Sequence, residues 1–105
     1  MNIGNIDNVS EEKVKRLVEE FVQEDKIKHM SVLLFLLHVD YATEADLRRA
    51  MTGGRYLAGR TAYVVLKELM DKGLIEMTRV KRYKIYRATE LGRRVAAEIA
   101  RRAGL

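Results

Sequence analysis

The sequence contains no cysteine, no proline and no tryptophan. Without cysteine the chain forms no disulfide and offers no thiolate ligand, which excludes disulfide-stapled scaffolds and cysteine-based zinc sites. The two histidines, His29 and His38, are nine residues apart, and this spacing matches no metal-binding motif. We therefore expect no metal and no cofactor, and the lack of cysteine favours a cytoplasmic location.

Long hydrophobic runs are missing as well. The longest run, from Val32 to Leu37, is far shorter than the about 20 residues that a membrane-spanning helix needs. The first residues, Met1 to Ser10, have neither a basic start nor an apolar core, so we expect no signal peptide. These absences predict a soluble protein that does not contact membranes.

Signatures of enzymes are also absent. There is no glycine-rich phosphate loop, nucleophile elbow or zinc pattern. The acids Asp40, Glu44 and Asp46 cluster around a predicted helix start, where the helix dipole favours negative charge without any catalytic role. We therefore predict a protein that is not an enzyme.

The length and composition predict one globular domain. The chain has 105 residues, of which 48% are hydrophobic, and a chain of this size buries roughly two-thirds of its unfolded surface. No repeat and no linker rich in proline, glycine or serine divides it. We predict a single domain over residues 1–105.

The charges are distributed unevenly. Residues 1–25 hold seven acids and three bases, whereas residues 26–105 hold seventeen bases and eight acids. The first segment therefore has a net charge of −4 and the remainder +9. A basic body favours a polyanionic partner, because phosphates attract it and release counterions on contact. Overall basicity is a weak indicator, so the positions of the bases matter more.

Apolar spacing predicts five helices. Hydrophobic residues recur every three or four positions, and Ser10, Thr43 and Thr89 stand at helix starts as N-caps. Thr43 and Asp46 have the spacing of a capping box. In chain order the predicted helices are residues 10–25, residues 27–39, a segment from Thr43 to the Gly53-Gly54 pair, about residues 60–72, and residues 90–103.

Two stretches rich in β-branched and aromatic residues predict a hairpin. They run from Leu74 to Val80 and from Tyr83 to Thr89, with Lys81-Arg82 between them. Lys-Arg is not a favoured two-residue turn, so a longer loop is the alternative.

Alternation along the hairpin predicts where its side chains lie. It places Arg79, Lys81 and Arg82 near the tip. It places Tyr83, Ile85 and Tyr86 against the core.

The segment from Thr43 to Thr89 carries the functional signal: a capped helix, a glycine turn, a second helix, a glycine stop and a basic hairpin. Its residues Leu66, Leu69, Gly73-Leu74-Ile75-Glu76 and Thr89-Glu90-Leu91-Gly92 resemble winged helix-turn-helix transcription regulators of the broad MarR/PadR type. The resemblance covers about residues 30–100, and Tyr63 looks like the tyrosine common in PadR-type recognition helices.

The resemblance implies the architecture. In that family the Leu-x-x-Leu…Gly-Leu-Ile run ends the recognition helix and starts the wing. The Thr-Glu-x-Gly step closes the wing and starts a helix often used for dimerisation. The implied fold is α+β, mainly α with a small β-hairpin: a winged helix-turn-helix over residues 27–89 with additional N- and C-terminal helices.

The connection between the two helices of this motif is longer than the usual tight turn of three or four residues. From Thr52 to Gly59 it either contains an extra helical turn at Tyr56–Ala58 or forms a loop that carries Arg55 toward phosphate.

Helical geometry predicts which residues of the recognition helix face DNA. Side chains opposite Ala62, Val65 and Leu66 turn away from the core, and the hairpin has no acid between Arg79 and Arg87. The alternative to a DNA-binding role is that the helix face is an ordinary solvated face and that the hairpin is an ordinary charged hairpin. The predicted DNA-binding residues are Arg55, Arg60, Thr61, Tyr63, Val64, Lys67, Arg79, Lys81, Arg82 and Lys84.

The apolar stripe of the first helix allows two interpretations. It packs on its own domain, or it pairs with the C-terminal helix of a second copy, since dimers suit a class that reads two half-sites. We predict a homodimer. Its predicted interface residues are Val14, Leu17, Phe21, Leu91, Val95 and Ile99.

These observations predict a sequence-specific, double-stranded DNA-binding transcriptional regulator, a repressor by resemblance to the family. A winged-helix module that binds other proteins and an architectural DNA-binding protein without sequence preference are the alternatives. No residue pattern marks a small-molecule effector. Salt-dependent binding to mixed-sequence DNA separates the three hypotheses.

Overall fold

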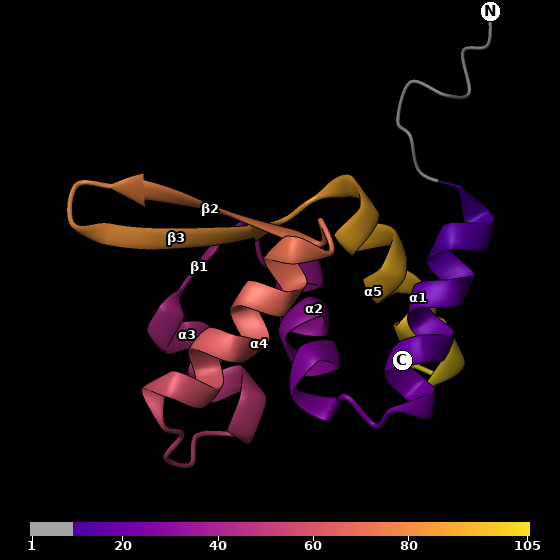
Figure 1. The fold of residues 1–105 in the computed structure, drawn as a ribbon, viewed down its shortest axis with the longest axis horizontal. Coiled ribbons are helices and arrows are strands. Elements are labelled where there is room, and N and C mark those ends of the chain that lie inside the picture. The colour runs from indigo at the N-terminus through magenta and orange to yellow at the C-terminus, as the bar shows by residue number, and fades with distance from the viewer. Residues whose placement is uncertain (1–9) are drawn as a thin grey trace, which may run out of the picture.

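The computed structural model describes residues 10–105, and the prediction about a signal peptide falls on residues that lie almost wholly outside this range. The described part contains helices and one small antiparallel sheet (Figure 1). The elements are α1 (Glu11–Gln23), α2 (Ile27–His38), β1 (Ala42–Thr43), α3 (Glu44–Thr52), α4 (Gly59–Asp71), β2 (Ile75–Val80), β3 (Tyr83–Ala88) and α5 (Glu90–Arg102).

Three helices begin at the predicted caps. Ser10 Oγ accepts the amide of Lys13 at 3.1 Å, and Thr89 Oγ1 accepts the amide of Gly92 at 3.0 Å. Thr43 and Asp46 form a full capping box, in which each side chain accepts the backbone amide of the other. These bonds satisfy amides that have no partner inside the helix, which fixes where each helix starts.

The capping box of α3 yields a stability prediction. We expect Thr43→Ala to lower the free energy of unfolding by about 1 kcal/mol, because the Asp46 amide loses its acceptor. Thr43→Ser keeps the hydroxyl and is the matched control; urea unfolding followed by circular dichroism measures both. Equal stability of the two variants would show that the cap contributes nothing.

The same capping box makes the contribution of the Asp46 carboxylate to folding stability depend on pH. The backbone amide of Thr43 lowers the pKa of the Asp46 carboxyl below its usual 3.8. A lowered pKa in the folded state means that the carboxylate stabilises the fold above its unfolded pKa. This stabilisation is lost as the pH falls through the folded pKa.

The sheet has the strand order β1-β3-β2, and both pairings are antiparallel. The turn of the β2–β3 hairpin consists of Lys81 and Arg82, with Lys81 at φ +57°. The two-residue turn is therefore correct, and the longer loop is not formed. The strand β1 was not predicted, because its two residues are too few for a period-two pattern.

The core is built around α2. Its faces contact α3 and α5, and α1 packs on α5 (Figure 1). This position explains why α2 is apolar on nearly every side. The largest fully buried side chains include Phe21, Leu33, Leu36, Leu47, Leu66, Leu69 and Leu74.

The apolar stripe of α1 lies inside this core. Val14, Leu17, Phe21, Val95 and Ile99 are all buried within one chain, and Leu91 is half-buried. This arrangement agrees with the interpretation that the stripe packs on its own domain. In a single copy these side chains are not on a free surface, so the homodimer stays a prediction. None of the helices between residues 10 and 105 has the length and apolarity needed to cross a membrane.

The hairpin extends beyond the helical body, on the side where α3 and the start of α4 lie (Figure 1). Only its base reaches the core: Ile75, Tyr86 and Ala88 are buried, and every other residue of β2 is exposed. The prediction that Tyr83 covers the core is wrong, because Tyr83 lies next to the turn and is exposed. Ile85 is half-buried and Tyr86 is buried, as predicted.

Candidate nucleic-acid interface

One face of α4 is exposed along its first turns. Ala62, Val65, Leu66 and Leu69 are buried against the body. The residues on the opposite face are exposed, and they are the five that the sequence predicted: Arg60, Thr61, Tyr63, Val64 and Lys67. Tyr63 is 57% exposed and Val64 is 45% exposed. An aromatic and an aliphatic side chain thus stand in water with cations on either side of them.

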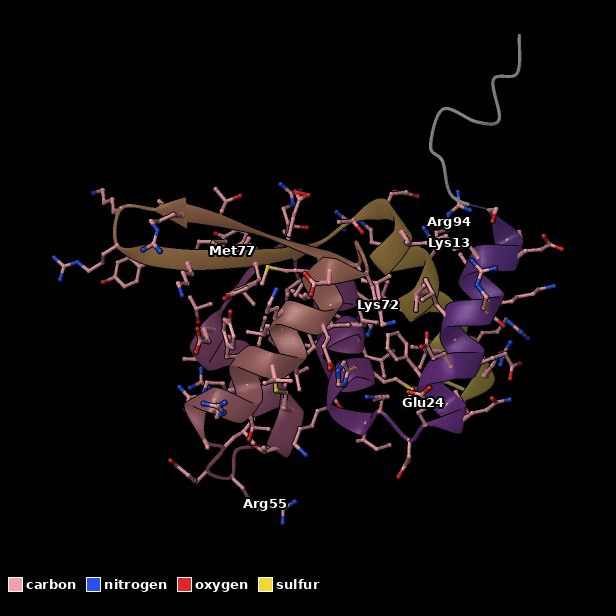
Figure 2. The ribbon with its side chains drawn as sticks, viewed as in Figure 1. Lys13, Glu24, Arg55, Lys72, Met77 and Arg94 are labelled. Atoms are coloured by element: carbon pink, nitrogen blue, oxygen red, sulfur yellow. The ribbon has the colours of Figure 1, made fainter. Side chains whose placement is uncertain are left out.

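The connection before α4 is a loop. No helical turn forms at Tyr56–Ala58, so that alternative is wrong. The Arg48 guanidinium donates to the Leu57 carbonyl at 2.8 Å, and Thr52 Oγ1 donates to the Arg55 carbonyl at 2.7 Å. Figure 2 shows Arg55 projecting from this loop, away from the helices.

The anchoring role of Arg48 was not predicted. A bond to a backbone carbonyl nine residues away leaves no pattern in the sequence. By fixing Leu57, Arg48 helps to fix where α4 begins.

The N-terminus of α4 is electrostatically open. Its N-cap residue, Ala58, has no side-chain hydrogen bond, and no acid lies in its first turn. In contrast, α3 and α5 each start with a side-chain cap and at least one acid. The partial positive charge of this helix end is therefore not neutralised by a capping side chain or by an acid in its own first turn.

A buried histidine holds α4 against the body. His29 in α2 is 7% exposed, and its Nε2 donates to Glu68 Oε1 in α4 at 2.6 Å. This hydrogen bond lowers the pKa of the Glu68 carboxyl, and the His29 ring lies beside Phe21 at 5.9 Å between centroids. The arrangement explains His29 as a structural residue with a satisfied ring nitrogen.

The register of the hairpin sorts its cations by face. Arg79 pairs with Lys84, on the same face as the pair Met77 and Tyr86. We call this the inner face, because Tyr86 on it is buried in the core; Figure 2 shows Met77 on the side of the hairpin toward α4. Lys81 and Arg82 form the turn itself.

The cations of the wing and of the loop are not engaged in ion pairs. Among residues 10–105, the following cations have no carboxylate partner: Arg55, Arg60, Arg79, Lys81, Arg82, Lys84 and Arg87. Lys67 is the exception, with Asp71 at 3.4 Å. Both side chains are exposed, and such a pair contributes at most about 1 kcal/mol.

The C-terminal helix shows the opposite arrangement. Arg101 and Arg102 both bond Glu98, and Arg102 also bonds Glu19 of α1 at 2.9 Å. These arginines lower the pKa of Glu98 to about 2. The charges of α5 are thus largely used within the fold, whereas those of the wing remain available to an external anion.

The first turn of α4 and the tip of the wing lie toward the same end of the molecule (Figure 1). In Figure 1 the first turn of α4 and the tip of the hairpin both lie at the end opposite α1 and α5. A B-DNA major groove is about 12 Å wide and admits one helix, while an adjacent ribbon can reach the backbone. The shape and the charge of this end therefore suit a double helix.

Comparisons with known proteins identify the fold. No protein-family model and no curated protein sequence matches the chain. The solved structures that it resembles include SSV1 F-93, with a TM-score of 0.61 and 19% identity over 73% of this chain and 86% of that one.

Two further matches come from bacteria. ZitR of Lactococcus lactis, in its apo form, has a TM-score of 0.65 and 19% identity over 99% of this chain and 74% of its own. The adhesin competence repressor AdcR of Streptococcus pyogenes has a TM-score of 0.62 and 20% identity over 90% of this chain and 72% of its own. Together with the α+β architecture, these matches show that the chain has the winged-helix fold.

Proposed function

We propose that this protein is a transcriptional regulator that binds specific sites on double-stranded DNA. The observation that carries the proposal is the set of unpaired cations on the α3–α4 loop, the start of α4 and the wing, three segments that lie toward the same end of the fold. Surfaces of globular proteins usually mix the two signs of charge. A hairpin tip that carries cations and no acid favours contact with phosphate.

Each side chain has a role in this proposal. Arg60 reaches guanine in the major groove through two parallel hydrogen bonds, and Val64 contacts a thymine methyl group. Thr61 and Tyr63 donate to phosphates. Arg55 and the four wing cations Arg79, Lys81, Arg82 and Lys84 neutralise the backbone on either side of the helix. Lys67 exchanges its weak pair with Asp71 for a phosphate.

Repression is the regulatory mode that we propose. One structure with the same fold is named a repressor, and the MarR/PadR-type motifs of the sequence point the same way. A small protein that occupies an operator needs no further activity to block transcription.

We propose that the protein acts as a homodimer on two half-sites about 34–36 Å apart. If two copies exchange α1, the contacts of Val14, Leu17 and Phe21 with α5 form between chains and keep these residues buried. Leu91, Val95 and Ile99 then supply the partner surface. Sedimentation analysis that gives only the monomer mass, with and without DNA, would contradict this arrangement.

Binding to DNA at several salt concentrations tests the proposed function. A regulator shows both a steep salt dependence and a preferred site, whereas an architectural protein shows the salt dependence alone. A module that binds only other proteins shows neither. We expect selection from a random duplex library to return one motif that outcompetes mixed-sequence DNA by at least about 10³-fold.

Arg60 gives a separate prediction about specificity. We expect Arg60→Ala to relax the preference at one base position and to cost about 1–3 kcal/mol on the preferred site, because a bidentate contact to guanine is lost. Binding to a panel of duplexes with single base changes measures this. An equal loss on every duplex would instead make Arg60 a phosphate contact.

A further inference from the structure

The outer face of the wing carries a groove that the proposed DNA contacts do not use. Strand register places Thr78, Val80, Tyr83 and Ile85 on the face opposite the buried Tyr86. The groove is open to solvent and has a volume of about 570 Å³. It is lined by Tyr41, Thr43, Thr78, Val80, Tyr83 and Ile85, with Arg87 toward the base of the hairpin. We call it the outer-face groove.

The polarity of the wing near its tip is the reverse of an ordinary half-buried sheet. Such a sheet places apolar residues inward and polar residues outward. Here the inner face ends in the pair Arg79 and Lys84, while the outer face carries the pair Val80 and Tyr83. The inward charges are accounted for by the proposed DNA contact. The outward apolar residues need a different explanation.

Packing within the hairpin explains only part of this surface. A cross-strand pair such as Val80 and Tyr83 stabilises a hairpin, yet these side chains remain 51% and 60% exposed. Tyr41 is 65% exposed and lies outside both strands of the hairpin. Because Tyr41 lines the same groove, the apolar surface extends beyond the hairpin across β1. The stability of the hairpin does not require an apolar residue there.

The charge around the groove indicates the partner. Arg87 lies in the groove without a carboxylate partner among residues 10–105, and Lys81 and Arg82 stand at the tip. The one acid within residues 75–88 is Glu76, which lies opposite Arg87 in the register but forms no ion pair with it. Two wings of the same chain would bring like charges together, which disfavours a symmetric pairing of wings. Tyrosine and arginine are also the residue types enriched at the centres of protein interfaces.

We propose that the outer-face groove docks a segment of another protein that carries aliphatic side chains beside carboxylates. The aliphatic groups cover Val80, Tyr83 and Tyr41, and a carboxylate pairs with Arg87. Because this face points away from the inner face, the groove stays open when DNA occupies the inner face and tip. The regulator then contacts DNA and an acidic protein partner at the same time.

Fluorescence anisotropy with three synthetic peptides tests this proposal on the full chain, without DNA. One peptide alternates leucine and glutamate, the second leucine and lysine, and the third serine and glutamate. We expect the leucine–glutamate peptide to bind at least about tenfold more tightly than the others. Tyr83→Ser and Arg87→Glu should each weaken it by at least about tenfold.

Two further variants keep the test decisive. Tyr41→Ala removes groove surface without touching the hairpin, so its expected loss of peptide binding does not depend on how Tyr83→Ser affects folding. Arg79→Ala, on the inner face, should leave peptide binding unchanged. Equal binding of the three peptides, or peptide binding that Tyr41→Ala leaves intact, would overturn the proposal.

Two other occupants are distinguished by the same variants. Self-association that Tyr83→Ser abolishes would make the occupant a second copy, and tight binding of single-stranded DNA that Tyr41→Ala abolishes would make it a nucleic acid. Either result overturns the docking of an acidic protein segment. Because the peptides are measured without DNA, failure here is separate from failure of the proposed function.

Discussion

Replacing Arg79, Lys81, Arg82 and Lys84 together with alanine is expected to weaken DNA binding by about 10²–10³-fold at about 0.15 M salt. Each phosphate contact contributes about fivefold there, since binding falls with salt at a slope of about 0.9 per contact. These four cations have no ion-pair partner among the described residues, so their replacement breaks no ion pair of the fold. The loss should be similar on every sequence, because phosphate contacts carry no base information.

A charge-matched control separates a wing contact from a general effect of net charge. Lys13, Lys15, Arg16 and Lys28 lie on α1 and α2, and Lys13 is at the end of the molecule opposite the wing (Figure 2). Replacing these four with alanine removes the same charge. We expect the slope of binding against salt to fall by about 3–4 for the wing variant and to stay nearly unchanged for the control. Equal slopes in the two variants would contradict a specific role of the wing.

Gly92→Ala is expected to destabilise the protein by about 2–4 kcal/mol, a large effect for one methyl group. A Cβ at this position would lie 2.0 Å from the carbonyl oxygen of Leu74 and 3.0 Å from its carbon. Both are backbone atoms, so no side chain can rotate away. The first turn of α5 would have to move off the base of the wing.

This contact also explains the glycine of the Thr-Glu-x-Gly motif. Thr89 donates its amide to the Leu74 carbonyl at 3.0 Å and its hydroxyl to the Gly73 carbonyl at 2.6 Å. The start of α5 is thereby tied to the segment between α4 and β2. Gly92 is needed because a helix passes directly over a backbone carbonyl, and this closeness sets the direction in which the wing leaves the body.

Thermal unfolding measures the effect of Gly92→Ala. We expect the Tm to fall by about 8–32 °C, given about 4–8 °C per kcal/mol for a domain of this size. Gly59→Ala is the control, because the nearest atom to its Cβ would be Arg48 Nη2 at an ordinary 3.7 Å. That variant should keep or slightly raise the Tm. A Tm for Gly92→Ala equal to that of Gly59→Ala would show that the close approach is not maintained in solution.

Much of the fold was predictable from local chemistry. Ser10, Thr43 and Thr89 are strong N-caps, Gly53 and Gly73 have positive φ at helix ends, and two alternating stretches of the chain form the hairpin. These signals act within a few residues of each other, so a single sequence displays them. The five exposed residues of α4 followed from the same helical periodicity.

The features that were missed depend on contacts between distant segments. β1 exists because residues 42–43 lie beside β3, and Arg48 reaches a carbonyl that only the folded loop presents. Tyr83 was predicted to cover the core, but the wing has already extended beyond the core at this residue, so Tyr83 is exposed. The sequence could not decide whether the predicted interface residues of α1 and α5 pack within one chain or between two copies. An apolar stripe predicts that it is covered but not which copy covers it.

The proposed function requires that the exposed face of α4 and the wing form a single surface for DNA. Backbone amide chemical shifts, recorded by NMR while a duplex of about 20 base pairs is added, test it most directly. We expect the shifted amides to cluster in Arg55–Lys67 and Arg79–Lys84, with small changes in α1 and in the second half of α5. Shifts centred on α1 and α5, or none in the wing at low salt, would contradict it.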